Sequence, residues 1–284
     1  MIAVQLLNGL AFGCLLFLMS GGLTLMYGLM GIINLAHGSY FMFGAYAALS
    51  TFKVTRNFLL AIVAGTIAGG VIGLLTERFL LRRLYGLHGH EAVLLTFALL
   101  LIIDDGCLWI WGGRPTFIPA PGFFNFPVNI FGSTYPSYRL VVILVGIMMA
   151  AGLWWFQEKT RWGAIIRAGV DDREMVGGLG INIPLVFTMV FALGASLAGF
   201  AGVMAAPILG VGPGLDVEVL VYALAVVIVG GLGSLHGCLI ISLLFGIVDT
   251  LGKIFWPGFA VLTIYIMVAT VLLIKPAGLF GKST

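Results

Sequence analysis

The sequence has very few charged residues. Asp, Glu, Lys and Arg make up 9% of its 284 residues, whereas they account for roughly a quarter of a soluble domain. Hydrophobic residues make up 61% and the mean hydropathy is +1.16. Apolar runs of about 20 residues, enough to span a bilayer, recur along the chain. Little polar sequence is left to cover a water-exposed surface, so the composition excludes a soluble protein and predicts an all-α, polytopic membrane helix bundle.

Cysteines and clusters of basic residues are also scarce. Cys14, Cys107 and Cys238 each lie inside an apolar segment without metal-ligand spacing, so we expect three small, buried, unpaired side chains. The 14 basic residues are spread among short loops with 11 acidic ones and form no basic arm that would bind nucleic acid. We expect these charges to fix the topology of a chain surrounded by membrane lipid.

The apolar segments predict the helices. No Lys or Arg precedes the first apolar run and no cleavage pattern follows it, so we interpret the N-terminus as a retained helix and not a signal peptide. Residues 2–52 are too many for one crossing and barely enough for three, which favours two crossings that meet at a break near 31–38. With the later segments this gives about eight to nine crossings, the later ones at 58–79, 92–111, 138–157, 185–207, 217–234, 235–252 and 258–275.

Basic residues in the loops predict the orientation. If the helices alternate, nine of the 14 basic residues fall on one side, around the loops 80–91 and 158–184 and the C-terminal tail. Cytoplasmic loops are enriched in Lys and Arg, so we place both loops and the C-terminus in the cytoplasm. The N-terminus and the Pro-, Gly- and aromatic-rich stretch 112–138 then lie outside.

The charged loop 158–184 has a helical pattern of its own. Apolar residues recur at helical spacing to about Ala168, Gly169 marks a bend, and Asp171 followed by Glu174 has the form of a capping box for a second, short helix. Acidic and basic residues are equal in number here. A mixed-charge surface suits a protein partner better than anionic lipid, which favours a basic excess. We expect partner docking, with a solvated connector as the alternative.

Polar residues interrupt the apolar sequence at GIINLAHGSY. They lie where a membrane helix tolerates polarity least. They either hydrogen-bond between helices and lock the bundle or shape a substrate path, since a discontinuous helix exposes its backbone only where it lines a cavity or is buried in protein. A loosely similar break recurs at GGLGSLHG, and paired breaks mark binding regions in transporters. The candidate path residues are Asn34, His37, Ser39, Tyr40, Tyr222, Ser234 and His236. Aromatic residues such as Tyr222 are more often part of the core, or in contact with lipid, than part of a substrate path.

The residues of an enzyme are missing. The terminal GLFGKST has two residues instead of four between Gly278 and the next Gly-Lys-Ser, so it does not match a nucleotide-binding P-loop. Asp104 and Asp105 are neighbours on a helix and do not face each other as a catalytic pair. The pair His88 and His90 has no third metal ligand nearby. We expect no catalytic residue, metal or cofactor on this chain; if ATP drives it, another subunit binds the ATP and Mg.

Several motifs together resemble one transporter family. GLMGIINLAHGSYFMFGAY, ERFLLRRLYG, GLGINIP, VVIVGGLGSLHG and KPAGLFGK occur in the order seen in the LivH-type permeases of branched-chain amino acid ABC importers. Relatives in this group resemble importers of urea, amides and aromatic acids. The resemblance covers essentially the whole chain and implies a single permease domain, residues 1–284, in the bacterial inner membrane.

The resemblance also implies partners. These are a second, LivM-like permease, two ATPases that are LivG-like and LivF-like, and a periplasmic substrate-binding protein. By position, residues 164–182 resemble the coupling segment that seats in a cleft of the ATPase, in agreement with the docking interpretation. The residues carried over to this role are Arg167, Asp171, Asp172, Arg173, Glu174, Gly177 and Gly180.

Two functions remain to be compared. The leading hypothesis is import of branched-chain amino acids, or a related small amphipathic solute, by alternating access powered by separate ATPases. The rival is an ion-coupled secondary transporter or a channel, which normally places charged groups in the membrane interior. Asp249 and Glu218 lie near predicted helix ends and no predicted segment carries a charge at its centre, so ion coupling is the weaker hypothesis. A membrane enzyme is weaker still.

Overall fold

The computed structural model describes residues 2–85, 89–124, 126–130 and 132–281. Within them the chain forms eleven α-helices, three short 3-10 helices and one β-hairpin. The helices are α1 Ile2–Met30, α2 His37–Thr55, α3 Phe58–Phe79, α4 Gly89–Trp111, α5 Ser137–Lys159, α6 Arg161–Asp171, α7 Arg173–Gly178, α8 Ile183–Leu209, α9 Leu215–Gly230, α10 Leu235–Phe255 and α11 Ala260–Ile274; the 3-10 helices are Leu81–Leu84, Gly122–Phe124 and Pro257–Phe259, and the strands are β1 Pro127–Ile130 and β2 Ser133–Pro136.

The predicted all-α membrane bundle is confirmed. Six helices in the described part of the chain are long and apolar enough to cross a membrane, namely α1, α3, α4, α5, α8 and α10. Helices α2, α9 and α11 have 19, 16 and 15 residues. A 16-residue helix rises about 24 Å, less than the roughly 30 Å of bilayer hydrocarbon. Three of the nine predicted segments are therefore shorter than a full span.

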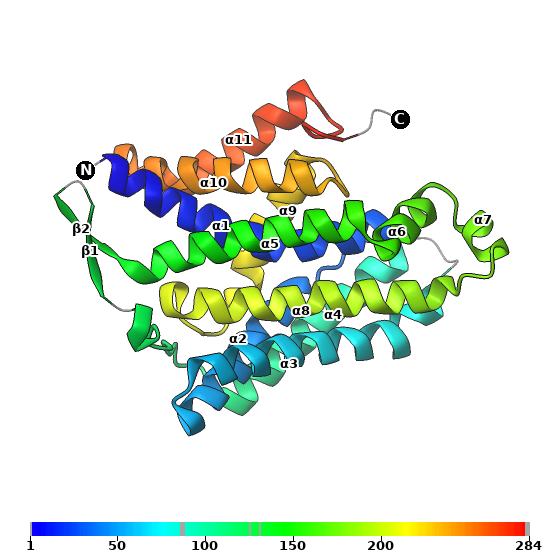
Figure 1. The fold of residues 1–284 in the computed structure, drawn as a ribbon, viewed down its shortest axis with the longest axis horizontal. Coiled ribbons are helices and arrows are strands. Elements are labelled where there is room, and N and C mark those ends of the chain that lie inside the picture. Colours follow the sequence, from blue (N-terminus) through cyan, green and yellow to red (C-terminus); the bar gives the residue numbers. More distant parts are fainter. Residues whose placement is uncertain (1, 86–88, 125, 131, 282–284) are drawn as a thin grey trace.

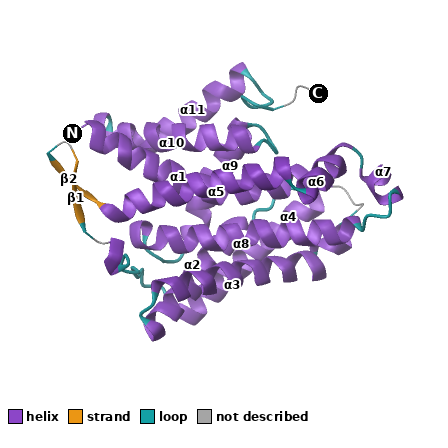
Figure 2. Cartoon of the chain, viewed as in Figure 1, coloured by secondary structure: helices purple, strands orange, loops and turns teal. Residues whose placement is uncertain are grey.

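The two ends of the bundle differ. The N-terminus and the hairpin lie at one end, and α6, α7 and the C-terminus lie at the other (Figure 1). Figure 2 shows the hairpin, in which Val128 pairs with Tyr135, against a largely helical chain. Because α6 lies within the loop 158–184 that the positive-inside rule assigns to the cytoplasm, we call its end of the bundle the inner end and the hairpin end the outer end.

Glycines set the closest helix contacts. A Cβ built on Gly44 of α2 would lie 2.4 Å from the Cα of Gly199 on α8, and one built on Gly9 of α1 would lie 2.8 Å from the Cα of Ile247 on α10. Both distances are shorter than van der Waals contact, so only glycine allows these backbones to approach so closely. The core lies around α1, α2 and α8, and the three cysteines are buried and unpaired, as expected.

The charged loop contains the two expected helices, but the junction between them differs from the prediction. No bend occurs at Gly169, since α6 continues to Asp171. The N-cap of α7 is Asp172, whose Oδ1 accepts a 2.9 Å hydrogen bond from the Met175 N–H. The predicted cap at Asp171 is wrong because an N-cap residue needs an extended backbone, which Asp172 has and a residue inside α6 does not. Glu174 still lies in the first turn, where its charge stabilises the helix N-terminus.

Two further features differ from the prediction, one helix end and one hairpin. Helix α9 was expected to reach residue 234 but ends at Gly230, because Gly231 adopts φ 98°, a conformation that favours glycine. The hairpin within 112–138 was not predicted. Its strands have four residues each, too short for an alternating pattern to stand out among the prolines and aromatic residues.

Candidate functional site

The polar break folds back into the bundle. Gly31, at φ 68°, ends α1, and its N–H still bonds to the Tyr27 carbonyl at 2.8 Å. The chain then turns back, so that Nε2 of His37, the first residue of α2, lies 2.9 Å from the carbonyl oxygen of Met19. Met19 precedes the end of α1 by eleven residues, about 16 Å along the helix. Helix α2 therefore begins beside the middle of α1.

Hydrogen bonds within the protein satisfy much of this break. Oδ1 of Asn34 accepts from the Ala36 N–H at 3.1 Å, and its Nδ2 lies 3.5 Å from the sulfur of Met26. The Leu35 N–H donates to the hydroxyl of Thr96 at 3.2 Å. Asn34 and His37 are 1% and 0% exposed and line neither of the cavities described below. This geometry matches the interhelical-lock alternative more closely than direct contact with substrate.

Ser39 links α2 to α9. Its hydroxyl donates to Oδ2 of Asp216 at 3.0 Å, and both residues are 0% exposed. The two helix starts touch directly, since a Cβ built on Gly38 would lie 2.2 Å from the Asp216 carbonyl oxygen. Sequence reasoning missed Asp216 because it lies just before the predicted helix 217–234. Its one sequence signal is that it is an acid at the edge of an apolar segment.

Tyr40 is a core residue. It is 0% exposed, and its ring packs edge to face against Phe191 of α8 and near the ring of His37, at centroid distances of 6.1 and 6.4 Å. Packing of this kind fixes the start of α2 against α8.

The second break, in the GGLGSLHG segment, lies at the inner end and is hydrogen-bonded to the C-terminal segment. The N–H groups of Leu279 and Phe280 donate to the carbonyls of Val229 and Gly230 at 2.8 and 3.2 Å, so the tail completes the end of α9. Ser234 is the N-cap of α10 and accepts from the Gly237 N–H at 3.1 Å. His236, also a predicted path residue, is exposed.

Two adjoining cavities open at the outer end, between α1, α8 and α10. The larger, of about 300 Å³, is bordered on a further side by α5 and is partly polar. The smaller, of about 70 Å³, lies against α2 and α9 and is mostly apolar. Phe12, Leu15, Leu209 and Lys253 line both, so the two cavities lie side by side, and we call them together the outer cavity. Tyr222 lines the smaller cavity and is the one predicted path residue found in this space.

The larger cavity contains charged side chains. Nζ of Lys253 lies 2.6 Å from Oδ2 of Asp249, whose side chain is only 4% exposed, and 5.4 Å from the centre of the Phe12 ring. Arg139, at the start of α5, bonds through Nη1 to Oδ1 of Asn8 on α1. The cavity therefore brings together one buried acid, two basic groups and a side-chain amide.

A second charged group lies at the inner end. Glu77 of α3 is 0% exposed and accepts hydrogen bonds from the hydroxyls of Tyr85 and Thr188, at 2.7 and 2.6 Å. Arg82 lies 3.9 Å from the same carboxylate. These bonds tie α3 and the residue after the following 3-10 turn to the second turn of α8, the helix that follows the coupling loop. The sequence analysis missed Glu77, because it considered the adjoining loop 80–91 only for its basic residues.

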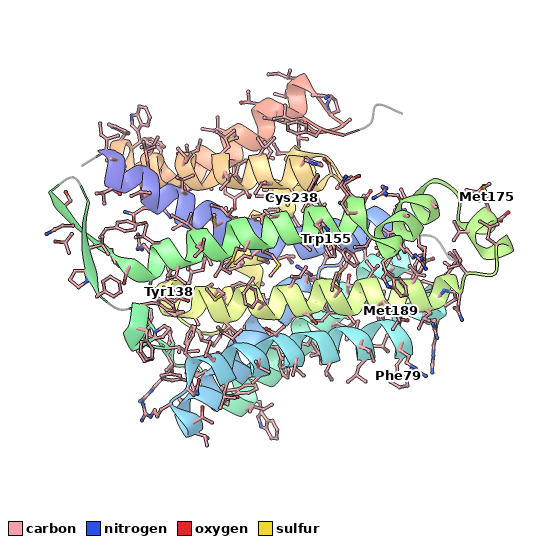
Figure 3. The ribbon with its side chains drawn as sticks, in the orientation of Figure 1. Phe79, Tyr138, Trp155, Met175, Met189 and Cys238 are labelled. Atoms are coloured by element: carbon pink, nitrogen blue, oxygen red, sulfur yellow. The ribbon has the colours of Figure 1, made fainter. Side chains whose placement is uncertain are left out.

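The predicted coupling loop projects from the inner end (Figure 3). Ile166 and Val176 are 4% and 3% exposed and anchor it, whereas Met175 and Leu179 are 66% and 73% exposed. Arg167 pairs with Glu158 at 3.8 Å, and Gly180, at φ 81°, turns the chain after α7. The side chains of Asp171 and Arg173 lie outside the part of the chain that the structure describes.

A bundle of apolar helices with buried polar breaks and an outer cavity defines a multi-pass membrane transport protein. Residues 5–274 match the family described as the permease component of the branched-chain amino acid transport system, and the chain belongs to this family. Its recognition as a LivH-type permease is thereby confirmed, as is its expected location as a multi-pass protein of the bacterial inner membrane. Members are transport subunits and not themselves enzymes, and the family implies ATPase and substrate-binding partners.

Similar proteins cover nearly the whole chain. The high-affinity branched-chain amino acid permease protein BraD of Pseudomonas aeruginosa is 28% identical over 98% of this chain and 95% of its own length, and LivH of Escherichia coli is 27% identical over the same shares. The ribose import permease RbsC of Escherichia coli is 26% identical over 82% of this chain and 72% of its own. The structure of PsaBC from Streptococcus pneumoniae in complex with Fab shares the fold, with a TM-score of 0.51, 14% identity and coverage of 94% and 89%.

Proposed function

We propose that this chain is the LivH-like permease subunit of an ABC importer that moves branched-chain amino acids, or a related small amphipathic solute, into the cytoplasm. Similarity to BraD and LivH over 98% of the chain supports the substrate class. In this proposal a LivM-like permease completes the pore, and a periplasmic binding protein delivers the substrate. LivG-like and LivF-like subunits bind ATP and Mg and hydrolyse the ATP, and this chain holds no cofactor.

The observation that carries the proposal is the exposed apolar tip of the coupling loop. Met175 projects from the inner end (Figure 3), and both Met175 and Leu179 are largely exposed. Exposed apolar side chains of this size suit burial in a protein cleft better than contact with water. The charged residues of the predicted docking surface are Arg167, Asp171, Asp172, Arg173 and Glu174. Gly177 lies in the last turn of α7, and its carbonyl accepts from the N–H of Gly180, which turns the chain towards α8.

The rival, ion coupling, has one specific candidate. Asp216 is buried, and its Oδ1 has no hydrogen-bond partner among the described residues. Glu77 and Asp249 are also buried, but each is engaged by neighbouring hydroxyl or ammonium groups. A single acid that is tied to Ser39 supports ion coupling less well than the coupling loop supports ATP-driven import.

The test is association of the permease with the ATPases encoded with it. We expect the double variant Asp171→Lys and Arg173→Glu, and separately Leu179→Asp, to weaken this association about tenfold or more, the usual result of removing an interface anchor. Membrane insertion should be unchanged. Thr134→Asp, which adds the same charge at an exposed position of β2 on the outer end, serves as the control. Normal ATPase binding and transport in both coupling-loop variants would make the loop a plain connector.

A further inference from the structure

The outer cavity carries an unusual set of charges for a space between membrane helices. Its two parts are lined by Arg139, Lys253, Asp249 and Glu218, two basic and two acidic groups. Asp249 is buried and Arg139 is half-buried, whereas Lys253 and Glu218 are exposed. A charged group buried within a membrane helix bundle is costly and marks a functional site by default. A balanced set of both signs is complementary to a ligand that itself carries both signs.

Arg139 is the group least explained by the protein's own contacts. It is half-buried, and its guanidinium donates to the neutral amide of Asn8. Among the described residues no carboxylate lies within 4.0 Å of its guanidinium, whereas Asp249 already pairs with Lys253. A guanidinium presents a planar fork of donors that matches a carboxylate. Arg139, supported by Asn8, is thus built to receive a carboxylate from outside the chain.

The apolar part of the cavity lies beside these charges. Phe12, Leu15 and Leu209 line both parts, and Phe41 and Tyr222 line the smaller part. A ligand with its charged end at Arg139 and Asp249 therefore has apolar surface next to it. Ligand sites typically combine such an apolar lining with a few polar groups that fix orientation.

We propose that this cavity is the permease's own substrate site and binds a zwitterionic α-amino acid with an apolar side chain. Arg139 receives the α-carboxylate, and the pocket of Phe12, Leu15 and Leu209 receives the side chain. Asp249 receives the α-ammonium group through Oδ1, while its Oδ2 keeps the 2.6 Å contact with Lys253. The proposal rests on the proposed function, because it takes the cargo to be an amino acid. An acid without an amino group would leave Asp249 without a cationic ligand group to bind, and a neutral sugar would need none of these charges.

The test is ligand protection of a cysteine placed in the cavity of the assembled transporter. Thr250 lines the larger part, and Thr250→Cys is a small change. With a water-soluble thiol reagent, we expect millimolar leucine to slow labelling at this position at least about threefold. Leucinamide, which lacks the carboxylate, and 4-methylpentanoate, which lacks the ammonium group, should not protect at the same concentration. Thr55→Cys, exposed at the outer end of α2, is the matched control and should label at the same rate with and without leucine.

A second substitution assigns the carboxylate partner. Adding Arg139→Gln should raise the leucine concentration needed for protection about tenfold or more, since it removes a charge-assisted hydrogen bond, while Arg139→Lys should have a smaller effect. Size-exclusion chromatography checks that each variant assembles. Equal protection by 4-methylpentanoate overturns the zwitterion assignment. Absence of protection in a complex that imports leucine overturns the site but leaves the proposed function intact. A complex that imports neither leucine nor a related small amphipathic solute contradicts the proposed function itself.

Discussion

The Ser39 hydroxyl donates a 3.0 Å hydrogen bond to the Asp216 carboxylate and joins the first turn of α2 to the first turn of α9. Two residues after Ser39, Phe41 lines the apolar part of the outer cavity, and Tyr222 lines it from α9. The bond therefore holds together two walls of the cavity. The polar break and the candidate substrate site are mechanically connected, although none of the break's own polar residues lines the cavity.

Replacing Ser39 should destabilise the permease. In Ser39→Ala the buried Asp216 loses the hydroxyl that donates to its Oδ2, and leaving a buried acceptor unsatisfied costs about 1 to 3 kcal/mol. The thermal unfolding midpoint of the purified complex should fall. Thr270→Ala, which removes an exposed hydroxyl that donates to the Ile266 carbonyl of its own helix, α11, should leave the midpoint unchanged. Equal midpoints for the two variants would show that the Ser39 bond does not hold α2 to α9.

Asn34 and His37 should behave as parts of a lock. Asn34→Ala removes the acceptor of the Ala36 N–H and should cost about 1 kcal/mol. His37→Gln keeps a donor for the Met19 carbonyl and should cost less. We expect uptake per assembled complex to remain close to that of the wild type in both variants, as measured by radiolabelled transport normalised to complex recovered. Lost uptake with normal assembly and melting would instead assign these residues to the substrate path.

The Glu77 cluster gives a prediction for the inner end. Glu77→Gln keeps the shape and one acceptor oxygen but removes the charge. Hydrogen bonds to charged groups contribute about 1.5 to 3 kcal/mol and neutral ones about 0.5 to 1.5. The free energy of unfolding should therefore fall by about 1 to 2 kcal/mol. Glu91→Gln, at an exposed position in the first turn of α4, is the control. Identical effects of the two substitutions would contradict a special role for the Tyr85 and Thr188 contacts.

The elements that depend on local sequence could be predicted. Helix α3 occupies 58–79 as expected, and two helices meet at a break near 31–38, because apolar length and glycine position are visible in the sequence. The N-cap of α7 was misplaced by one residue, because Asp171 forms the capping-box pattern with Glu174, whereas Asp172 caps the helix through its own side chain without that pattern. Helix α9 was drawn too long because the apolar run continues through Gly231, and only its backbone angle ends the helix.

The features that depend on distant contacts could not be predicted. The burial of Asp216 requires Ser39, 177 positions away, and that of Glu77 requires Thr188, 111 positions away. The outer cavity brings together residues from α1, α5, α8 and α10, whose adjacency follows from tertiary packing. Of the predicted path residues, Tyr222 lines that cavity, while Ser234 and His236 lie at the inner end, where the second break proved to be a cap stabilised by the C-terminal segment.

The measurement that tests the central claim most directly is uptake into proteoliposomes. We expect vesicles that contain this chain, its partner permease and both ATPases to accumulate radiolabelled leucine when the binding protein is outside and ATP is supplied to the ATPase side. Vesicles with this chain alone should accumulate none, with ATP or with an imposed proton or sodium gradient. Accumulation driven by a gradient in vesicles that contain this chain alone would contradict ATP-powered import and support the ion-coupled alternative.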